Sequence, residues 1–83
     1  MTRNIIAILR GIRPEEVIEV AKVIANAGIN HIEVALNSPE AFKSIKLLSD
    51  EMKGPVKVGA GTVTNVHEVE ILSRIGIDFI VSP

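Results

Sequence analysis

The feature of this 83-residue chain that most limits its fold is a repeating unit, a short apolar strand followed by an amphipathic helix. Four apolar runs have the length of buried strands and begin roughly 22–26 residues apart; they occupy residues 5–9, 31–36, 56–59 and 78–81. Such strict alternation predicts an α/β fold with a parallel sheet and right-handed crossover connections. An open doubly wound sheet and part of a (β/α)8 barrel both fit this pattern.

The similar construction of successive units favours the barrel. In AGINHIEVAL, KGPVKVGAGT and IGIDFIVSP, a glycine and a short link precede an apolar strand, and small or polar residues follow it. A complete barrel takes about 200–250 residues. We therefore predict that residues 1–83 are a partial domain, the N-terminal half of a TIM (β/α)8 barrel, with about four strands, three helices and the remainder missing.

Helix start signals lie in each of the three intervals between the strands. Pro14 stands where a first helical residue is well tolerated. Ser38 is the expected N-cap of the second helix, with Pro39 at its first position. Asn65, with Glu68 three residues further on, resembles a capping box at the start of the third helix.

Composition argues against several classes of function. A net charge of −1 gives no electrostatic reason to expect nucleic acid or an anionic membrane as a partner. Without cysteine, the chain has no disulfide, no thiolate metal site and no cysteine nucleophile. No apolar run approaches the roughly 20 residues that span a bilayer, and the first residues lack the features of a signal peptide. We therefore expect a cytoplasmic protein.

A glutamate interrupts the second apolar run. If Ile32 and Val34 point at the helices, then His31 and Glu33 point into the barrel. Ligands of parallel α/β folds bind at the carboxyl ends of the strands, so an inward glutamate in the upper part of a strand is a candidate general acid/base. The alternative is a structural carboxylate that pairs with a neighbouring cation such as Arg10.

Other polar and small residues also follow the strands. Arg10 could clamp an anionic substrate or could be an ordinary surface cation. The GAGT motif at 59–62 would let the backbone approach a ligand, but an ordinary strand-to-helix turn explains it better, since neither phosphate-loop pattern is complete. Lys57 begins its strand, so a solvated lysine is favoured over a Schiff-base lysine. His31 and His67 lack the spacing of a zinc site.

Together, the stretches IIAILRGI, IEVALNSPEAFKSI, VGAGTV and FIVSP resemble the start of the 2-dehydro-3-deoxy-6-phosphogluconate and 6-phosphogalactonate aldolases, which include bifunctional 4-hydroxy-2-oxoglutarate aldolases. The resemblance covers nearly the whole chain. It implies a class I (Schiff-base) aldolase, a carbon–carbon lyase that cleaves a 2-keto-3-deoxy-6-phospho sugar acid to pyruvate and glyceraldehyde 3-phosphate. It also implies a homo-oligomer, usually a trimer, that needs no metal or other cofactor.

The resemblance further assigns roles to individual residues. Glu33 matches the catalytic glutamate that moves protons, and Arg10, Thr62 and Pro83 match residues that contact substrate. Asn37 is a fourth substrate-binding candidate; gluconate-type enzymes often carry arginine there, so LNSP looks more like the galactonate type. The Schiff-base lysine comes from a later strand, so we expect the isolated fragment to be inactive. Two alternatives are a non-catalytic half-barrel that self-associates and another phosphosugar-processing barrel enzyme.

Overall fold

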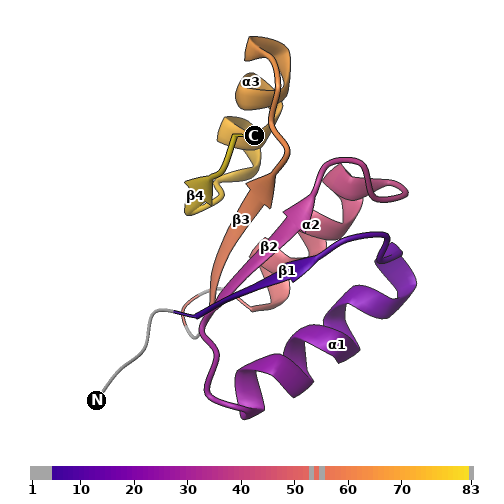
Figure 1. The fold of residues 1–83 in the computed structure, drawn as a ribbon, viewed down its shortest axis with the longest axis vertical. Helices are drawn as coiled ribbons and strands as arrows, with labels where there is room; N and C mark the ends of the chain where they lie inside the picture. The colour runs from indigo at the N-terminus through magenta and orange to yellow at the C-terminus, as the bar shows by residue number, and fades with distance from the viewer. Residues whose placement is uncertain (1–4, 53, 55, 83) are drawn as a thin grey trace.

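The computed structural model describes residues 5–52, 54 and 56–82. Strands and helices alternate along the chain (Figure 1): β1 (Ile6–Leu9), α1 (Pro14–Asn26), β2 (His31–Ala35), α2 (Ala41–Glu51), β3 (Lys57–Gly61), α3 (Val66–Ile75) and β4 (Phe79–Ile80). The strands form one sheet in the order β1-β2-β3-β4, and every neighbouring pair is parallel. The predicted α/β alternation and parallel sheet are therefore confirmed.

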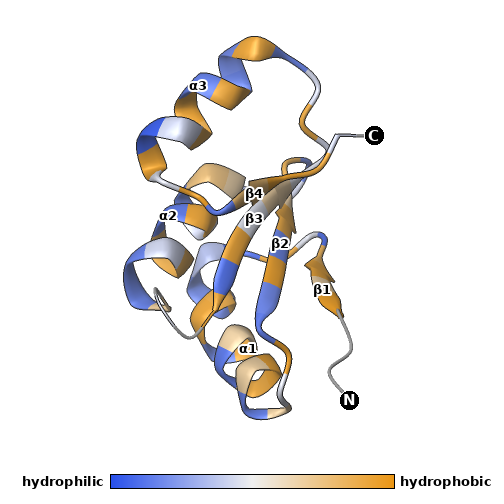
Figure 2. Cartoon of the chain, turned by 90° about the vertical axis from the view of Figure 1, so that its left-hand side faces the viewer, coloured by the Kyte–Doolittle hydropathy of each residue, from blue (hydrophilic) through white to orange (hydrophobic). Residues whose placement is uncertain are grey.

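The three helices lie on one side of the sheet (Figure 2). A doubly wound sheet has helices on both faces, whereas a barrel has all its helices outside the ring of strands. The one-sided arrangement is that of a barrel segment. The face of the sheet that would line the barrel interior is open, and Ile8 of β1 is 59% exposed there.

The hydrophobic core lies between the sheet and the helices. Ile32 and Val34 of β2 and Val58 of β3 are at most 1% exposed on this outer face. They pack with apolar residues of the three helices: Val17, Ala21, Ala41, Ile45, Leu48 and Leu72. Full burial of an aliphatic side chain is worth about 1.5–3 kcal/mol, so this layer supplies most of the stability of the segment.

The second helix begins later than the sequence predicts. Ser38 is not its N-cap; the helix starts at Ala41, and Glu40 precedes it with a φ of 47° and no side-chain cap. The Ser38 hydroxyl instead accepts a hydrogen bond, 2.9 Å long, from the backbone N–H of Gly11. A long-range partner thus takes the side chain that local sequence signals assign to the helix, and Pro39 lies in the turn before it.

The third strand is longer than predicted. Ala60 and Gly61 continue β3, pairing with Val34 and Ala35 of β2. The predicted turn at 59–62 is therefore wrong for its first three residues. Only Thr62 leaves the strand, and it does so with a φ of 60°.

The start of the third helix largely matches the prediction. The Asn65 side chain accepts a hydrogen bond from the Glu68 N–H at 2.9 Å. The Glu68 carboxylate accepts the backbone N–H and the hydroxyl of Thr64, at 2.8 and 3.2 Å. These bonds, chiefly the one from the Thr64 N–H, hold the pKa of the Glu68 carboxyl below its ordinary value. The second half of the capping box thus lies one residue earlier than expected.

Candidate active site

The carboxyl ends of the parallel strands bring together residues that are far apart in the sequence (Figure 1). Arg10 follows β1, Asn37 follows β2 after one intervening residue, and Thr62 follows β3. In (β/α)8 barrels this end of the strands carries the active site. Three of the predicted substrate-binding residues therefore lie at one end of the sheet, whereas Pro83 lies outside the described residues.

Glu33 occupies the central part of this site because β2 lies between β1 and β3. Its Cα partners are Ile8 of β1 and Gly59 of β3. Strand alternation places its side chain on the face opposite the buried Ile32 and Val34. Glu33 thus points to the interior face, as the sequence predicts, and it is nevertheless only 6% exposed.

The Glu33 side chain leans toward the carboxyl end of the sheet. Its terminal atoms lie against the backbone of Gly61, two residues beyond its direct partner Gly59: a Cβ placed on Gly61 would be 2.7 Å from Cδ of Glu33. The carboxylate is therefore carried from the middle of β2 to the level where the strands end.

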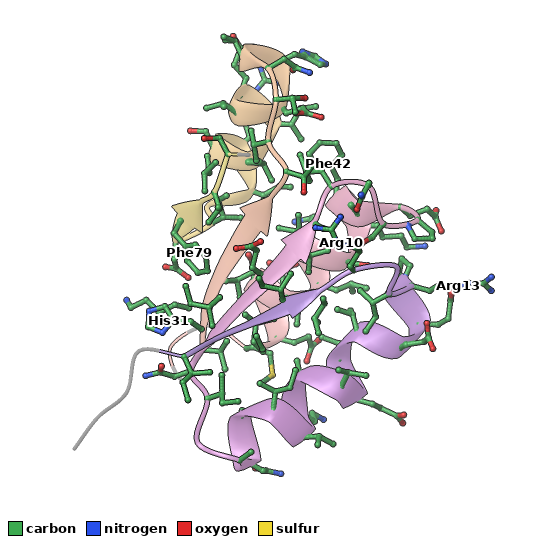
Figure 3. The ribbon with its side chains drawn as sticks, in the orientation of Figure 1. Arg10, Arg13, His31, Phe42 and Phe79 are labelled. Carbon is green, nitrogen blue, oxygen red and sulfur yellow. The ribbon has the colours of Figure 1, made fainter. Side chains whose placement is uncertain are left out.

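The Glu33 carboxylate has no charged partner among the described residues. Arg10 is exposed and forms no ion pair with it. Among the described residues, the ion pair that does form joins Nζ of Lys46 to Oδ2 of Asp50, 3.5 Å apart on α2. Figure 3 shows the Arg10 side chain projecting from the end of β1. The alternative of a structural Arg10–Glu33 pair is therefore wrong for this structure.

Thr62 adopts a backbone conformation that threonine seldom takes. Its φ of 60° places it in the left-handed region, although it is β-branched. That conformation costs about 1–2 kcal/mol for a residue other than glycine. Strained residues of this kind cluster at functional sites. Thr62 directly follows Gly61, which contacts Glu33, so the strained residue lies beside the candidate carboxylate.

Sequence patterns missed the part that Ser38 plays at this end of the sheet. Ser38 is 6% exposed, and its bond to Gly11 joins the connection after β1 to the connection after β2. Arg10 and Asn37 are the immediate neighbours of the two bonded residues. The bond therefore sets the spacing of two predicted substrate-binding residues. A serine before a proline is also the signal of a helix N-cap, so the sequence alone did not indicate this hydrogen bond.

Three other polar residues lie away from this site. Lys57 is exposed at the amino end of β3 and pairs in register with His31, so it does not reach the carboxyl ends. Nδ1 of His31 lies 2.8 Å from Oδ1 of Asn30, and its ring centroid is 5.9 Å from that of Phe79 (Figure 3). His67 is exposed on α3. Within the described ranges, no three histidine, cysteine or acidic side chains gather as a metal site would require.

A hollow of about 210 Å³ lies at the opposite end of the sheet, on the helical side. Its lining residues come from α2, α3 and the amino ends of β3 and β4: Ser49, Asp50, Val56, Val58, Ile75, Gly76 and Asp78. None of the predicted site residues lines it. Because ligands of parallel α/β folds bind at the carboxyl ends of the strands, the open interior face is the better candidate.

These features define the class of the protein. A parallel sheet with its helices on one side is a segment of a (β/α)8 barrel. A family model described as KDPG and KHG aldolase matches residues 1–83, the whole chain. The chain therefore belongs to the KDPG and KHG aldolase family.

Among the described residues, no helix is both long and apolar enough to cross a membrane.

Curated relatives include aldolases of both sugar-acid types. A probable 2-dehydro-3-deoxy-6-phosphogalactonate aldolase of Rhizobium meliloti is 41% identical over the whole chain, which covers 39% of that protein. The 2-dehydro-3-deoxy-6-phosphogalactonate aldolase of Escherichia coli is 39% identical over 95% of the chain and 38% of its own length. The chain thus spans less than two fifths of these relatives.

Solved structures agree with this assignment. A native KDPGal structure matches with a TM-score of 0.91 and 40% identity, over 94% of this chain and 38% of that one. A KDPG aldolase from Legionella pneumophila, with pyruvate captured as a covalent carbinolamine intermediate, matches with a TM-score of 0.89 and 28% identity. It covers 96% of this chain and 38% of its own. The fold of residues 1–83 is therefore that of the corresponding part of these aldolases.

Proposed function

We propose that this chain supplies the proton-transfer side of the active site of a class I aldolase. The substrate is a 2-keto-3-deoxy-6-phospho sugar acid, and the products are pyruvate and glyceraldehyde 3-phosphate. The observation that carries the proposal is the position of Glu33, a nearly buried carboxylate without an ion-pair partner among the described residues, near the level where the strands end. Family membership supports the reaction class.

The proposed chemistry gives Glu33 two proton transfers. A lysine from a later strand forms a Schiff base with the keto carbon of the substrate and so provides an electron sink. Glu33 takes the proton from the C4 hydroxyl as the C3–C4 bond breaks and the bonding electrons move into the Schiff base. The aldehyde leaves, and Glu33 returns a proton to the resulting enamine carbon, which becomes the methyl group of pyruvate. Hydrolysis then frees pyruvate and lysine.

An unpaired carboxylate suits this role better than a paired one. A neighbouring guanidinium would stabilise the charged form and weaken the carboxylate as a base. Arg10, Asn37 and Thr62 surround the site at the strand ends and are the proposed substrate-binding residues, with Thr62 on the pyruvate part. Pro83 belongs to the same proposal through the resemblance of its motif alone.

Galactonate-type specificity is part of the proposal. Two 6-phosphogalactonate aldolases are 41% and 39% identical over 100% and 95% of the chain, whereas gluconate-type enzymes of Zymomonas mobilis and Dickeya dadantii are 39% and 32% identical over only 77% and 83% of it. Asn37, in LNSP, supports the same choice. We also infer a cytoplasmic homotrimer. A chain with 40% identity and a TM-score of 0.91 forms part of a designed protein cage made by fusing symmetric oligomeric domains, which supports oligomerisation.

A chimeric barrel tests the function. Residues 1–83 replace the corresponding segment of the Rhizobium meliloti relative, which then supplies the rest of the barrel. We expect cleavage of the 6-phosphogalactonate substrate and a covalent adduct with pyruvate after borohydride reduction. Glu33→Gln should retain the adduct but lower kcat by about 10²–10⁴-fold. The exposed Glu19→Gln on α1 is the matched control.

Two results would contradict the proposal. Full cleavage activity in Glu33→Gln would remove Glu33 from the mechanism. A folded chimera that forms the pyruvate adduct but cleaves neither sugar acid would contradict the substrate class.

A non-catalytic half-barrel that self-associates is the second candidate, and the exposed apolar residues support it. Ile6 and Ile8 of β1 are 44% and 59% exposed, and Ile80 of β4 is 40% exposed. Unpaired edge strands promote pairing with other chains, and two four-stranded segments would give eight strands. Sedimentation of the 83-residue chain distinguishes the cases, since a well-behaved monomer counts against self-association.

A further inference from the structure

The glycine at position 61 needs an explanation other than backbone conformation. Gly61 lies inside β3, pairs with Ala35, and accepts the N–H of Leu36 at 2.9 Å through its carbonyl oxygen. It is not among the glycines with a positive φ, which are residues 11, 28, 54 and 76. An alanine could adopt the same extended backbone, so conformational freedom is not what position 61 requires.

Space is what position 61 requires. A Cβ on Gly61 would collide with Oε2 of Glu33 and would lie 2.7 Å from its Cδ and 3.2 Å from its Cγ. Three consecutive atoms of one side chain therefore lie along the bare backbone of β3. The part of the GAGT motif that resembles a ligand-binding turn is instead occupied by the protein's own carboxylate.

Gly59 shows the same arrangement one step earlier on the same face. A Cβ on Gly59 would collide with the ring of Phe79, which belongs to β4. One side chain from each neighbouring strand, Glu33 from β2 and Phe79 from β4, thus lies over a glycine of β3 (Figure 3 labels Phe79). The two occupants differ in stiffness: the aromatic ring is rigid, whereas the end of a glutamate can rotate away.

We propose that Gly61 is a positioning residue for Glu33, resting on the proposed function. Its missing side chain lets the carboxylate lie against β3 near the strand ends. Because the end of Glu33 is flexible, an alanine at position 61 displaces the carboxylate and leaves the strand paired. The variant Gly61→Ala therefore moves the proton-transfer group without removing it. Gly59→Ala differs, because it opposes a rigid ring and destabilises the fold.

The first experiment uses the 83-residue chain and does not depend on aldolase activity. Carbon-13 NMR of labelled glutamate follows the Glu33 Cδ resonance through a pH titration. In Gly61→Ala we expect a changed chemical shift and a changed titration midpoint for Glu33, with the resonance of the exposed Glu19 unaltered. An unchanged Glu33 titration in a folded Gly61→Ala chain would overturn the inference.

The second experiment is a double-mutant cycle in the chimeric barrel. Gly61→Ala should lower kcat by about 10–100-fold with pyruvate adduct formation intact, and it should have no further effect in a Glu33→Gln background. Additive losses would show that Gly61 acts independently of Glu33 and would overturn the inference. Full activity of Glu33→Gln alone would instead refute the proposed function, while the NMR titration would still test the positioning.

If Gly61→Ala fails to fold, a double variant that combines Gly61→Ala with Glu33→Ala provides the test. Removing the Glu33 side chain clears the space that a Cβ at position 61 needs, so the double variant should recover the stability of Glu33→Ala alone. A double variant that stays unfolded would show that the clash with Glu33 is not what prevents folding, and it would overturn the inference.

Discussion

The two faces of the sheet differ sharply although they share the same strands. On the helical face, Ile32 and Val34 are completely buried among aliphatic side chains. On the interior face, Ile8 is 59% exposed, Glu33 has no ion-pair partner among the described residues, and Gly61 presents no side chain at all. Alternate residues of one strand thus serve different purposes: one row stabilises the fold, and the other leaves room for the Glu33 carboxylate.

The largest expected effect compares two isoleucines in adjacent strands. Ile32 faces the helices at 0% exposure, and Ile8, next to Glu33 in register, faces the interior at 59%. Ile32→Ala should lower the free energy of unfolding by about 2–5 kcal/mol, and Ile8→Ala by less than about 1 kcal/mol. Urea unfolding followed by circular dichroism measures both. Equal losses would mean that the interior face is packed as tightly as the helical one.

The next effect removes the carboxylate from the interior face. Glu33→Met keeps the length of the side chain and removes a carboxylate without an ion-pair partner among the described residues, so stability should be retained or should rise by up to about 1 kcal/mol. The exposed Glu19→Met should leave stability within about 0.5 kcal/mol. Urea midpoints decide the outcome, and a less stable Glu33→Met would show that the carboxylate has stabilising contacts.

Backbone strain gives a similar but smaller contrast. Thr62 follows β3 and has a φ of 60°. Glu40 precedes α2 and has a φ of 47°. Replacing either by glycine should raise the free energy of unfolding, measured by urea unfolding, by about 1 kcal/mol, because glycine adopts this conformation without strain. In the chimeric barrel, only Thr62→Gly should also weaken pyruvate binding. If Glu40→Gly weakens it as much, the strain at Thr62 has no special link to substrate.

The smallest effect concerns the start of α3. The pKa of Glu68 is lowered in the folded chain, mainly by the Thr64 N–H, so the charged form stabilises the helix start above the ordinary value of about 4.5. That stabilisation is lost as the pH falls through the lower folded pKa. The protection factor of the Thr64 amide, which is its exchange rate relative to the intrinsic rate at the same pH, should therefore fall under acid, and Glu68→Gln should abolish this change in protection. Glu70→Gln, an exposed neighbour on α3, should preserve it.

The arrangement of elements was predictable because its signals are local and repeated. Four apolar runs separated by helical stretches sufficed for the parallel sheet, and the period of two placed Glu33 opposite Ile32 and Val34. The direction of Glu33 was therefore accessible from sequence. Its chemical role, and those of Arg10, Asn37, Thr62 and Pro83, depend on the substrate, which the pattern of strands and helices does not encode.

The features that sequence reasoning missed depend on contacts between distant residues. Ser38 looks like an N-cap, and only the folded chain shows that Gly11, 27 positions away, provides its hydrogen-bond donor. The glycines of GAGT look like a turn because a residue without a side chain shows no inward or outward preference. Their strand position and their occupants, Glu33 and Phe79, become visible only when the neighbouring strands are in place.

The hydrogen bond between Ser38 and Gly11 has a consequence for recombining aldolases of this family. It joins the two loops that follow β1 and β2, so that grafting one of them from a relative without the other leaves the Ser38 hydroxyl or the Gly11 amide without its partner. Altered substrate preference should therefore be sought by transplanting both connections together.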